Sequence, residues 1–278
     1  MIVVKEVKSF FKENIDNRRY IFKLAMSSAK ADTSNTTLGM YWNVVRDLVF
    51  FVAYGFFMMA IRDKAGIIED MPLLVYLFTG LVGWYFISDS LNKGVTCIKK
   101  NKKIFTKIKF PILIIPTFET IAIFIKRGTT LALLAVILII FHVVGYFTPN
   151  INVIGLIYAL FASFIFCVAY NLLMSGFYTI SKDFRELYKA IVRIQFYFVP
   201  IFWSVYTDIP RFLPYDWVIP VFENLPFIHL INSFRRAITM GEIPSLVNIG
   251  IFLVIVLVMF WVGCYVQYRL RRIYADFV

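Results

Sequence analysis

Long apolar runs separated by polar and basic segments dominate the pattern of this chain. Six runs are apolar enough to enter a bilayer, at about 40–61, 72–92, 111–147, 152–180, 190–206 and 245–267. A helix of about 17–25 residues crosses the hydrocarbon core of a membrane, and a helix satisfies its own backbone polar groups there. The pattern therefore predicts an all-α integral membrane protein with six transmembrane helices.

The first 39 residues follow a different pattern. Residues 2–15 place apolar side chains on one side of a helix and lysines on another. The apolar set is Val3, Val4, Val7, Phe10, Phe11 and Ile15, and the basic set is Lys5, Lys8 and Lys12. Residues 17–30 resemble a second helix of this kind. We therefore expect residues 1–39 to be cytoplasmic amphipathic interface helices, followed by a single transmembrane domain over 40–278.

Two stretches depart from plain membrane spans. Residues 207–244 contain five prolines, at 210, 214, 220, 226 and 244, so they cannot form one span. We expect an outer gate region there, with two short helices dipping partway into the membrane. Lys126 and Arg127 interrupt the run at 111–147. Either this helix is tilted or broken with the pair turned inward, which we favour, or the pair snorkels to an interface.

The balance of charge orients these segments. The chain is 60% hydrophobic and 17% charged, with a net charge of +12. Residues 93–111 hold seven lysines and no acid, which keeps this loop on the cytoplasmic side. The segments assigned to the cytoplasm hold 21 Lys and Arg, against 5 in those assigned to the outside. We expect a multi-pass plasma-membrane protein with both termini in the cytoplasm.

The basic segments also suggest partners. Ile98, Ile104, Phe105 and Ile108 give the 93–111 loop an apolar side, which favours a short helix along the inner surface over a merely solvated loop. Residues 181–193 are a second, shorter basic cytoplasmic loop. Clustered bases beside a membrane indicate anionic headgroups and cytoplasmic partners. Nucleic acid is a poor partner for so apolar a chain.

Catalytic and metal-binding motifs are missing. The sequence has no GxxxxGK[ST] loop for a nucleotide and no HExxH. Cys97, Cys167 and Cys264 are far apart, and His142 stands alone. We therefore expect a transport subunit and not an enzyme, with neither metal nor cofactor of its own. For Glu119 and Asp47 we favour structural salt bridges, for instance with Arg46 or Lys126, over a catalytic or proton-relay pair.

Several motifs along almost the whole chain resemble one family. They are Leu38-Gly39 before Trp42, FTGLVGWYFISDSLNKG (78–94), KFPILIIPT (109–117), SKDFRELY (181–188), FVPIFWS (198–204), Asn224-Leu225-Pro226 and Phe234-Arg235-Arg236-Ala237. Together they resemble the type-2 ABC-transporter permeases that export lipid-linked polysaccharides such as O-antigen, capsule and teichoic acid. Arg46-Asp47 departs from this pattern, because such permeases often carry Asn-Pro-Leu there. The first span then lines its channel differently.

The resemblance implies a partnership and a substrate. This subunit would form a homodimer with two copies of a separate ABC ATPase, and that ATPase would hold the ATP and Mg. The substrate would be a lipid-linked polymer, with wall teichoic acid as the nearest resemblance. The lysine-rich helix and the 181–188 turn would contact the ATPase. The residues expected in this coupling are Lys99, Lys100, Lys102, Lys103, Phe105, Lys107, Lys109, Phe110, Asp183 and Arg185.

Other residues fit steps in polymer transport. Arg18, Arg19 and Lys23 would attract a pyrophosphate headgroup. The aromatic residues that could stack on sugar rings in the channel are Tyr41, Trp42, Trp84, Tyr85, Phe202 and Trp203. For these, interface belts and helix packing are the alternative roles. The charges expected inside the membrane are Arg46, Asp47, Glu119, Lys126 and Arg127.

Two other functions compete with polymer export. A stand-alone channel or ion-coupled transporter would use Glu119, Lys126 and Arg127, but it predicts inverted repeats, and the two halves of the chain show no convincing similarity. A membrane enzyme acting on prenyl-linked sugars needs clustered carboxylates at one surface, and these are missing. ATP-driven polymer export is therefore the favoured function.

Overall fold

The computed structural model describes residues 2–31, 37, 39, 41–61, 66–101, 111–215 and 217–275. Five helices in this part of the chain are long and apolar enough to cross a membrane. They are α3 (Tyr41–Ile61), α4 (Leu73–Asp89), α7 (Ile115–Val143), α8 (Val153–Ile180) and α13 (Leu246–Ala275). A π-helical turn, η1 (Ser90–Gly94), extends α4, and a 3₁₀ turn, η2 (Ile112–Ile114), precedes α7. The all-α membrane fold is thereby confirmed.

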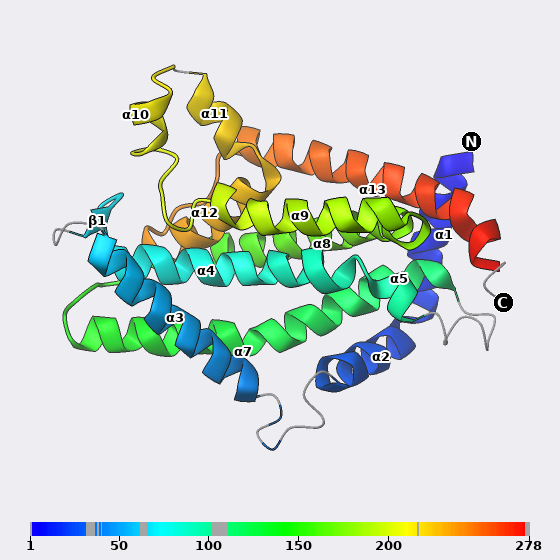
Figure 1. Ribbon diagram of the computed structural model, residues 1–278, viewed down its shortest axis with the longest axis horizontal. Helices are drawn as coiled ribbons and strands as arrows, with labels where there is room; N and C mark the ends of the chain where they lie inside the picture. The colour runs from blue at the N-terminus through cyan, green and yellow to red at the C-terminus, as the bar shows by residue number, and fades with distance from the viewer. Residues whose placement is uncertain are drawn as a thin grey trace.

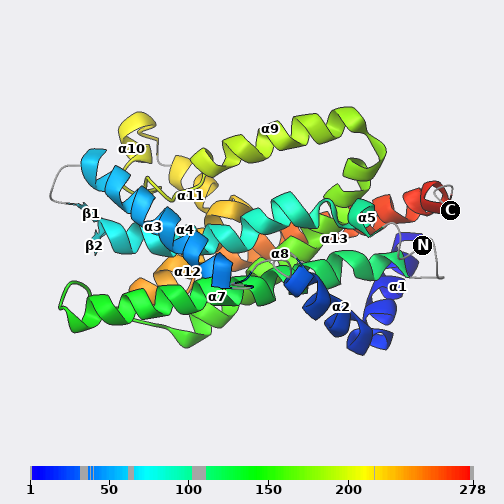
Figure 2. The same ribbon diagram turned by 60° about the horizontal axis from the view of Figure 1, so that its bottom comes forward.

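A sixth helix, α9 (Lys182–Phe198), also runs along the length of the bundle (Figures 1 and 2). It is shorter than the other five, at 17 residues, and charged in its first half. The prediction of a loop at 181–193 is therefore wrong, because these residues form the first part of α9. The Ser181 hydroxyl caps the helix by accepting a hydrogen bond from the Phe184 backbone N–H at 3.1 Å. The span expected at 190–206 ends early, since Val199 precedes a proline and is extended.

Both termini lie at one end of the bundle (Figure 1). The same end holds α1 (Ile2–Asp16), α2 (Arg18–Ala31) and the short helix α5 (Cys97–Lys100). Both N-terminal helices therefore form where their periodicity predicted. Ile21, Ala25 and Ala29 recur every four residues on α2 and are buried in a cluster that includes Phe118 of α7. The apolar stripe of α2 thus packs on protein.

The opposite end carries the irregular segments. A hairpin of β1 (Ile67–Ile68) and β2 (Met71–Pro72) follows α3. Three helices, α10 (Ile209–Phe212), α11 (Val218–Glu223) and α12 (Pro226–Thr239), occupy the stretch where two were expected. The third of these helices, α12, has 14 residues and is largely buried in contact with α4 and α8.

Close packing explains the position of α12. Ile231, Phe234 and Ile238 belong to the main hydrophobic cluster together with Leu77 and Leu81 of α4. Gly83 of α4 faces α12, and a Cβ placed there would lie 3.5 Å from the Phe234 ring and 3.6 Å from the Ile231 backbone. A small residue on α4 therefore lets the two helices approach closely.

The long helix α7 is unbroken from Ile115 to Val143. Lys126 is only 5% exposed, and the Arg127 side chain is 11% exposed. The pair therefore turns inward on a continuous helix. No kink is needed, because other helices supply partners for Arg127.

Candidate functional site

Arg127 of α7 lies at the centre of a buried charge cluster. Its Nε donates to Asp89 of α4 at 2.8 Å, and its Nη1 lies 3.3 Å from Asp47 of α3. Thr130, one helical turn further on, donates its hydroxyl to Asp47 at 2.5 Å. The guanidinium carbon lies 4.7 Å from the centre of the Tyr85 ring. We call Asp47, Tyr85, Asp89, Arg127 and Thr130 the Arg127 cluster.

The Arg127 cluster joins three of the membrane-spanning helices. Asp47 is 3% exposed, so its charge depends on Arg127 and Thr130 for compensation. Arg46, the neighbour of Asp47 on α3, is exposed and bonds Asn43 of its own helix at 2.9 Å. Asp47 therefore forms a structural salt bridge, as expected, but its partner is Arg127 and not one of the suggested residues, Arg46 or Lys126. The reason is that Asp47 faces α7 whereas Arg46 faces outward.

Glu119 of α7 forms a second junction, near the termini. Ser28 of α2 donates to one carboxylate oxygen at 3.1 Å, and Asn101, which follows α5, donates to the other at 2.9 Å. The Lys100 ammonium lies 3.6 Å away. Glu119 is 3% exposed, and the partners expected for it, Arg46 and Lys126, are not the ones these contacts show. The junction ties α2 and the end of α5 to α7.

Replacing Glu119 with glutamine is expected to loosen α2. The amide keeps one acceptor oxygen but turns its N–H groups toward one of the two donors, Ser28 or Asn101, and it loses the ion pair with Lys100. Amide protection across residues 18–31 should fall about tenfold, measured by hydrogen exchange in detergent. Glu186→Gln on the exposed side of α9 is the control. Equal exchange of α2 in both variants would contradict the junction.

The predicted coupling residues are only partly described. Lys102, Lys103, Phe105, Lys107, Lys109 and Phe110 lie outside the described residues. Lys99 and Asp183 are exposed, and Arg185 is half-buried with its Nε donating to Ser181 O at 3.2 Å. The α5 segment and the start of α9 lie at the same end of the bundle (Figures 1 and 2).

A buried contact connects these two segments to each other. The Tyr188 hydroxyl of α9 donates to the Leu91 carbonyl in η1, directly before α5, at 2.7 Å. Tyr188 is 6% exposed, so this bond is shielded from water. The bond therefore ties α9 to the π-helical turn that precedes α5.

The proposed headgroup residues Arg18, Arg19 and Lys23 are all exposed on the first turns of α2. Nothing in the described residues covers this basic surface at the end that holds the termini. The three side chains are thus accessible to a headgroup that lies against α2.

The six predicted substrate aromatics do not gather on one surface. Tyr41 and Trp42 are exposed at the start of α3. Trp84 is 4% exposed and contacts Phe196 of α9, so it packs helices and has no free face for a sugar. Tyr85 belongs to the Arg127 cluster. Phe202 packs between Tyr54 and Phe196 at 5.4 and 5.3 Å, and Trp203 meets Phe222 of α11 at 6.3 Å.

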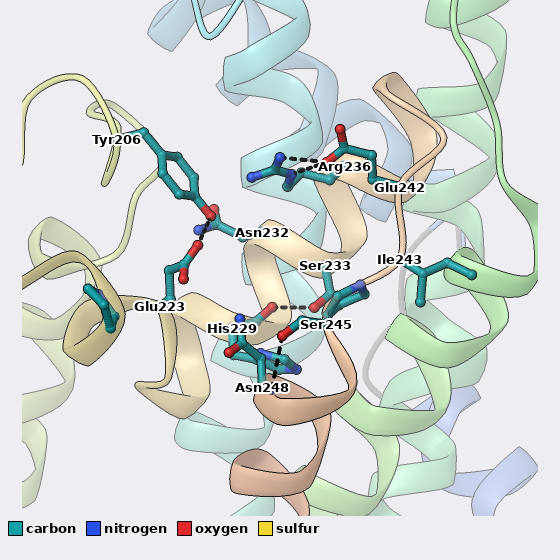
Figure 3. A pocket seen from close by; sticks show the side chains of 12 residues that line it. Tyr206, Glu223, His229, Asn232, Ser233, Arg236, Glu242, Ile243, Ser245 and Asn248 are labelled. Atoms are coloured by element: carbon teal, nitrogen blue, oxygen red, sulfur yellow. Dashed lines mark hydrogen bonds and ion pairs between the residues drawn. The ribbon is translucent and has the colours of Figure 1, made fainter.

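A polar pocket of about 440 Å³ lies between α11, α12 and the start of α13 (Figure 3), on the side of the bundle away from the termini (Figure 1). Its floor is one face of α12, where His229, Asn232, Ser233 and Arg236 follow the spacing i, i+3, i+4, i+7. Sequence reasoning missed this site. The signal was a stripe of four polar side chains along one face of this helix.

The walls of this pocket come from four other segments. Tyr206 donates its hydroxyl to Glu223 of α11, and Arg236 donates to Glu242 at 2.8 Å. The Arg236 guanidinium carbon lies 5.1 Å from the centre of the Tyr206 ring. Asn248 closes the pocket from the first turn of α13. Burial raises the pKa of Tyr206, and the neighbouring Glu223 carboxylate raises it further, so the phenol stays a donor.

The fold and its buried charges define an integral membrane protein of several helical spans. No family model matches the chain. The chain is similar to the O-antigen export system permease protein RfbA of Myxococcus xanthus, at 20% identity over 191 residues. The similarity covers 68% of this chain and 70% of that protein.

Proposed function

We propose that this chain is the membrane-spanning permease subunit of an ATP-driven exporter of a lipid-linked polysaccharide. The similarity to an O-antigen export permease, over two thirds of both chains, carries this proposal. A separate subunit hydrolyses ATP with Mg, since the sequence has no phosphate-binding loop. The exported polymer is wall teichoic acid, on the resemblance of the motifs quoted above.

The arrangement of the basic segments supports docking of an ATPase. The exposed Lys99 of α5 and Asp183 of α9 lie at the end of the bundle that holds both termini. This end is cytoplasmic in the proposal, in keeping with the excess of lysine and arginine assigned to it. The Tyr188–Leu91 bond and the Glu119 junction connect the docking segments to α9, α2 and α7.

The exposed face of α9 supports a homodimer with two ATPase copies. Glu186, Lys189 and Arg193 are exposed along this helix, and lipid does not tolerate such a row of charges. A water-filled path shared with a second copy of the chain accommodates them. The polymer then passes between two α9 helices, while Arg18, Arg19 and Lys23 receive its pyrophosphate headgroup.

The competing ion-coupled transporter fits these contacts less well. It requires Glu119, Lys126 and Arg127 to act as one relay. Glu119 instead bonds Ser28, Asn101 and Lys100, whereas Arg127 bonds Asp47 and Asp89. These are contacts between helices, as expected of structural junctions.

Gentle affinity purification from native membranes tests the proposal. The masses of all co-eluting subunits should show an ATPase in a one-to-one ratio with this chain. A lone oligomer without an ATPase would contradict the proposal and favour the ion-coupled transporter.

Reversing three charges in the lysine-rich loop is expected to uncouple the ATPase. Lys102→Glu, Lys103→Glu and Lys107→Glu together should lower the co-purified ATPase about tenfold, because like charges across an interface weaken association. The readouts are ATPase recovery and polymer export. The control changes Lys8, Lys12 and Lys30 to Glu, three exposed lysines of α1 and α2, and should retain the ATPase. Full export by a correctly inserted loop variant would contradict the coupling role.

A further inference from the structure

We propose that the outer pocket between α11, α12 and α13 binds one neutral sugar residue. The proposal rests on the proposed function, which it deepens by giving the sugar part of the polymer a binding site. The pocket lies at the end of the bundle opposite the docking segments (Figures 1 and 3).

The floor of the pocket consists of polar side chains that are almost fully buried. His229, Asn232 and Ser233 are 3%, 8% and 3% exposed. The His229 Nε2 bonds the Tyr158 hydroxyl at 2.8 Å, and the Asn232 carbonyl oxygen accepts from Arg235 at 3.2 Å. The amide nitrogen of Asn232 has no hydrogen bond among those recorded and lines the pocket (Figure 3). A ligand that supplies an acceptor there gives this donor a hydrogen-bond partner.

The balance of charge selects against an anion. The charged side chains of the lining are Glu223, Glu242 and Arg236. Glu242 neutralises Arg236 at 2.8 Å, so Glu223 leaves the lining with an excess negative charge. A phosphate or pyrophosphate would meet two carboxylates and one occupied guanidinium. Hydroxyl groups fit better, because they can donate hydrogen bonds to the carboxylates. The amides of Asn232 and Asn248 can both donate hydrogen bonds to hydroxyl groups and accept them.

The size and shape also fit a sugar ring. A volume of about 440 Å³ lies in the range of small-ligand sites, which is about 300–1,000 Å³. Tyr206 contributes an aromatic ring beside the carboxylates (Figure 3), and aromatic rings bury the apolar faces of sugars. Among the described residues, no group of three or more His, Cys, Asp or Glu side chains could hold a metal ion, in this pocket or elsewhere.

The position of the pocket suggests its role. Glu223 belongs to the expected gate region and Tyr206 directly precedes it, whereas Asn248 belongs to the last membrane-spanning helix. A sugar bound between them contacts both sides at once. Occupancy therefore links the position of α11 to the arrival of polymer at the outer end.

Saturation-transfer NMR on the purified full chain in lipid nanodiscs tests the proposal. The probes are glucose, galactose, N-acetylglucosamine and N-acetylmannosamine, with glycerol 3-phosphate as the anionic comparison. At least one neutral sugar should receive saturation, and glycerol 3-phosphate should receive about tenfold less. Asn232→Leu should reduce the sugar signal about tenfold, by removing a hydrogen bond.

A second variant guards against misfolding of the first. Asn248→Trp fills the pocket from α13 and leaves the α12 stripe intact, and it should abolish the sugar signal. Asn92→Ala is the matched control, because this exposed amide at the other end of α4 bonds only the Ser88 carbonyl. Binding of none of the four sugars, equal signals in Asn248→Trp and the control, or a stronger signal from glycerol 3-phosphate would each overturn the proposal.

The two proposals fail separately. Recovery of the ATPase with no sugar binding leaves the permease assignment in place and rejects the sugar site. Sugar binding that Asn248→Trp abolishes, in a chain that recovers no ATPase, supports the site and rejects the permease assignment.

Discussion

Replacing Arg127 with methionine is expected to destabilise the bundle by about 3–5 kcal/mol, the usual effect of removing one partner of a buried ion pair. Asp47 is 3% exposed, and the Asp89 side chain is 14% exposed. Without Arg127, both carboxylates lose their compensating charge. The midpoint of thermal unfolding in detergent should fall by about 10 °C, measured by the loss of the monodisperse peak on gel filtration.

The matched control is Arg46→Met. Arg46 is an arginine on α3 beside Asp47, but it is exposed and bonds only Asn43 in the contacts recorded. Its loss should change stability by no more than about 0.5 kcal/mol.

Removing all three charges of the Arg127 cluster separates the cost of leaving carboxylates unpaired from the cost of losing the ion pairs themselves. In a triple variant, Asp47→Leu and Asp89→Leu accompany Arg127→Met, so no carboxylate is left unpaired. This variant should recover much of the lost stability, because apolar groups of similar size often replace a buried ion pair at little cost. Equal midpoints for Arg127→Met and Arg46→Met would contradict the structural role of the cluster.

Replacing Arg235 with methionine is expected to cost about 3 kcal/mol or more. This arginine is 1% exposed. Its guanidinium donates to the carbonyls of Tyr76 at 3.3 Å and Pro200 at 2.6 Å, and to Asn232 at 3.2 Å. The guanidinium carbon also lies 3.5 Å from the centre of the Tyr76 ring. Methionine fills the space but leaves the Pro200 carbonyl without this partner.

Arg236→Met on the same helix is the control, because Arg236 is half-exposed and pairs with the exposed Glu242. Its effect on the unfolding midpoint should be a small fraction of that of Arg235→Met. Gly80→Ala should reproduce the larger effect from the other side, since a Cβ at Gly80 would collide with the Arg235 guanidinium. Similar midpoints for the two arginine variants would contradict the account.

Local pattern alone predicted the class and most of the helices. Five of the six expected spans coincide with long apolar helices, because burial of about 20 apolar residues in lipid depends only on the segment itself. The helices α1 and α2 follow from periodicity for the same reason. The start of α9 was misplaced, because its charged first half resembles a loop in composition. Ser181 nevertheless caps this segment as a helix.

Other features depended on which helix faces meet. Asp47 and Arg127 are 80 residues apart, and Ser28 and Glu119 are 91 apart, so no local pattern pairs them. The sequence favoured salt bridges for Asp47 and Glu119 but could not identify Arg127 and Lys100 as their partners.

The sequence by itself therefore determined a basic, all-helical membrane protein with N-terminal amphipathic helices. The tertiary structure decided that α12 is buried, that Arg127 joins α3, α4 and α7, and that four polar residues of α12 form the floor of a pocket. The physical reason is that hydrophobic burial is proportional to a segment's own area. Ion pairs and hydrogen bonds, in contrast, require two groups within about 3–4 Å, and only packing brings distant residues that close.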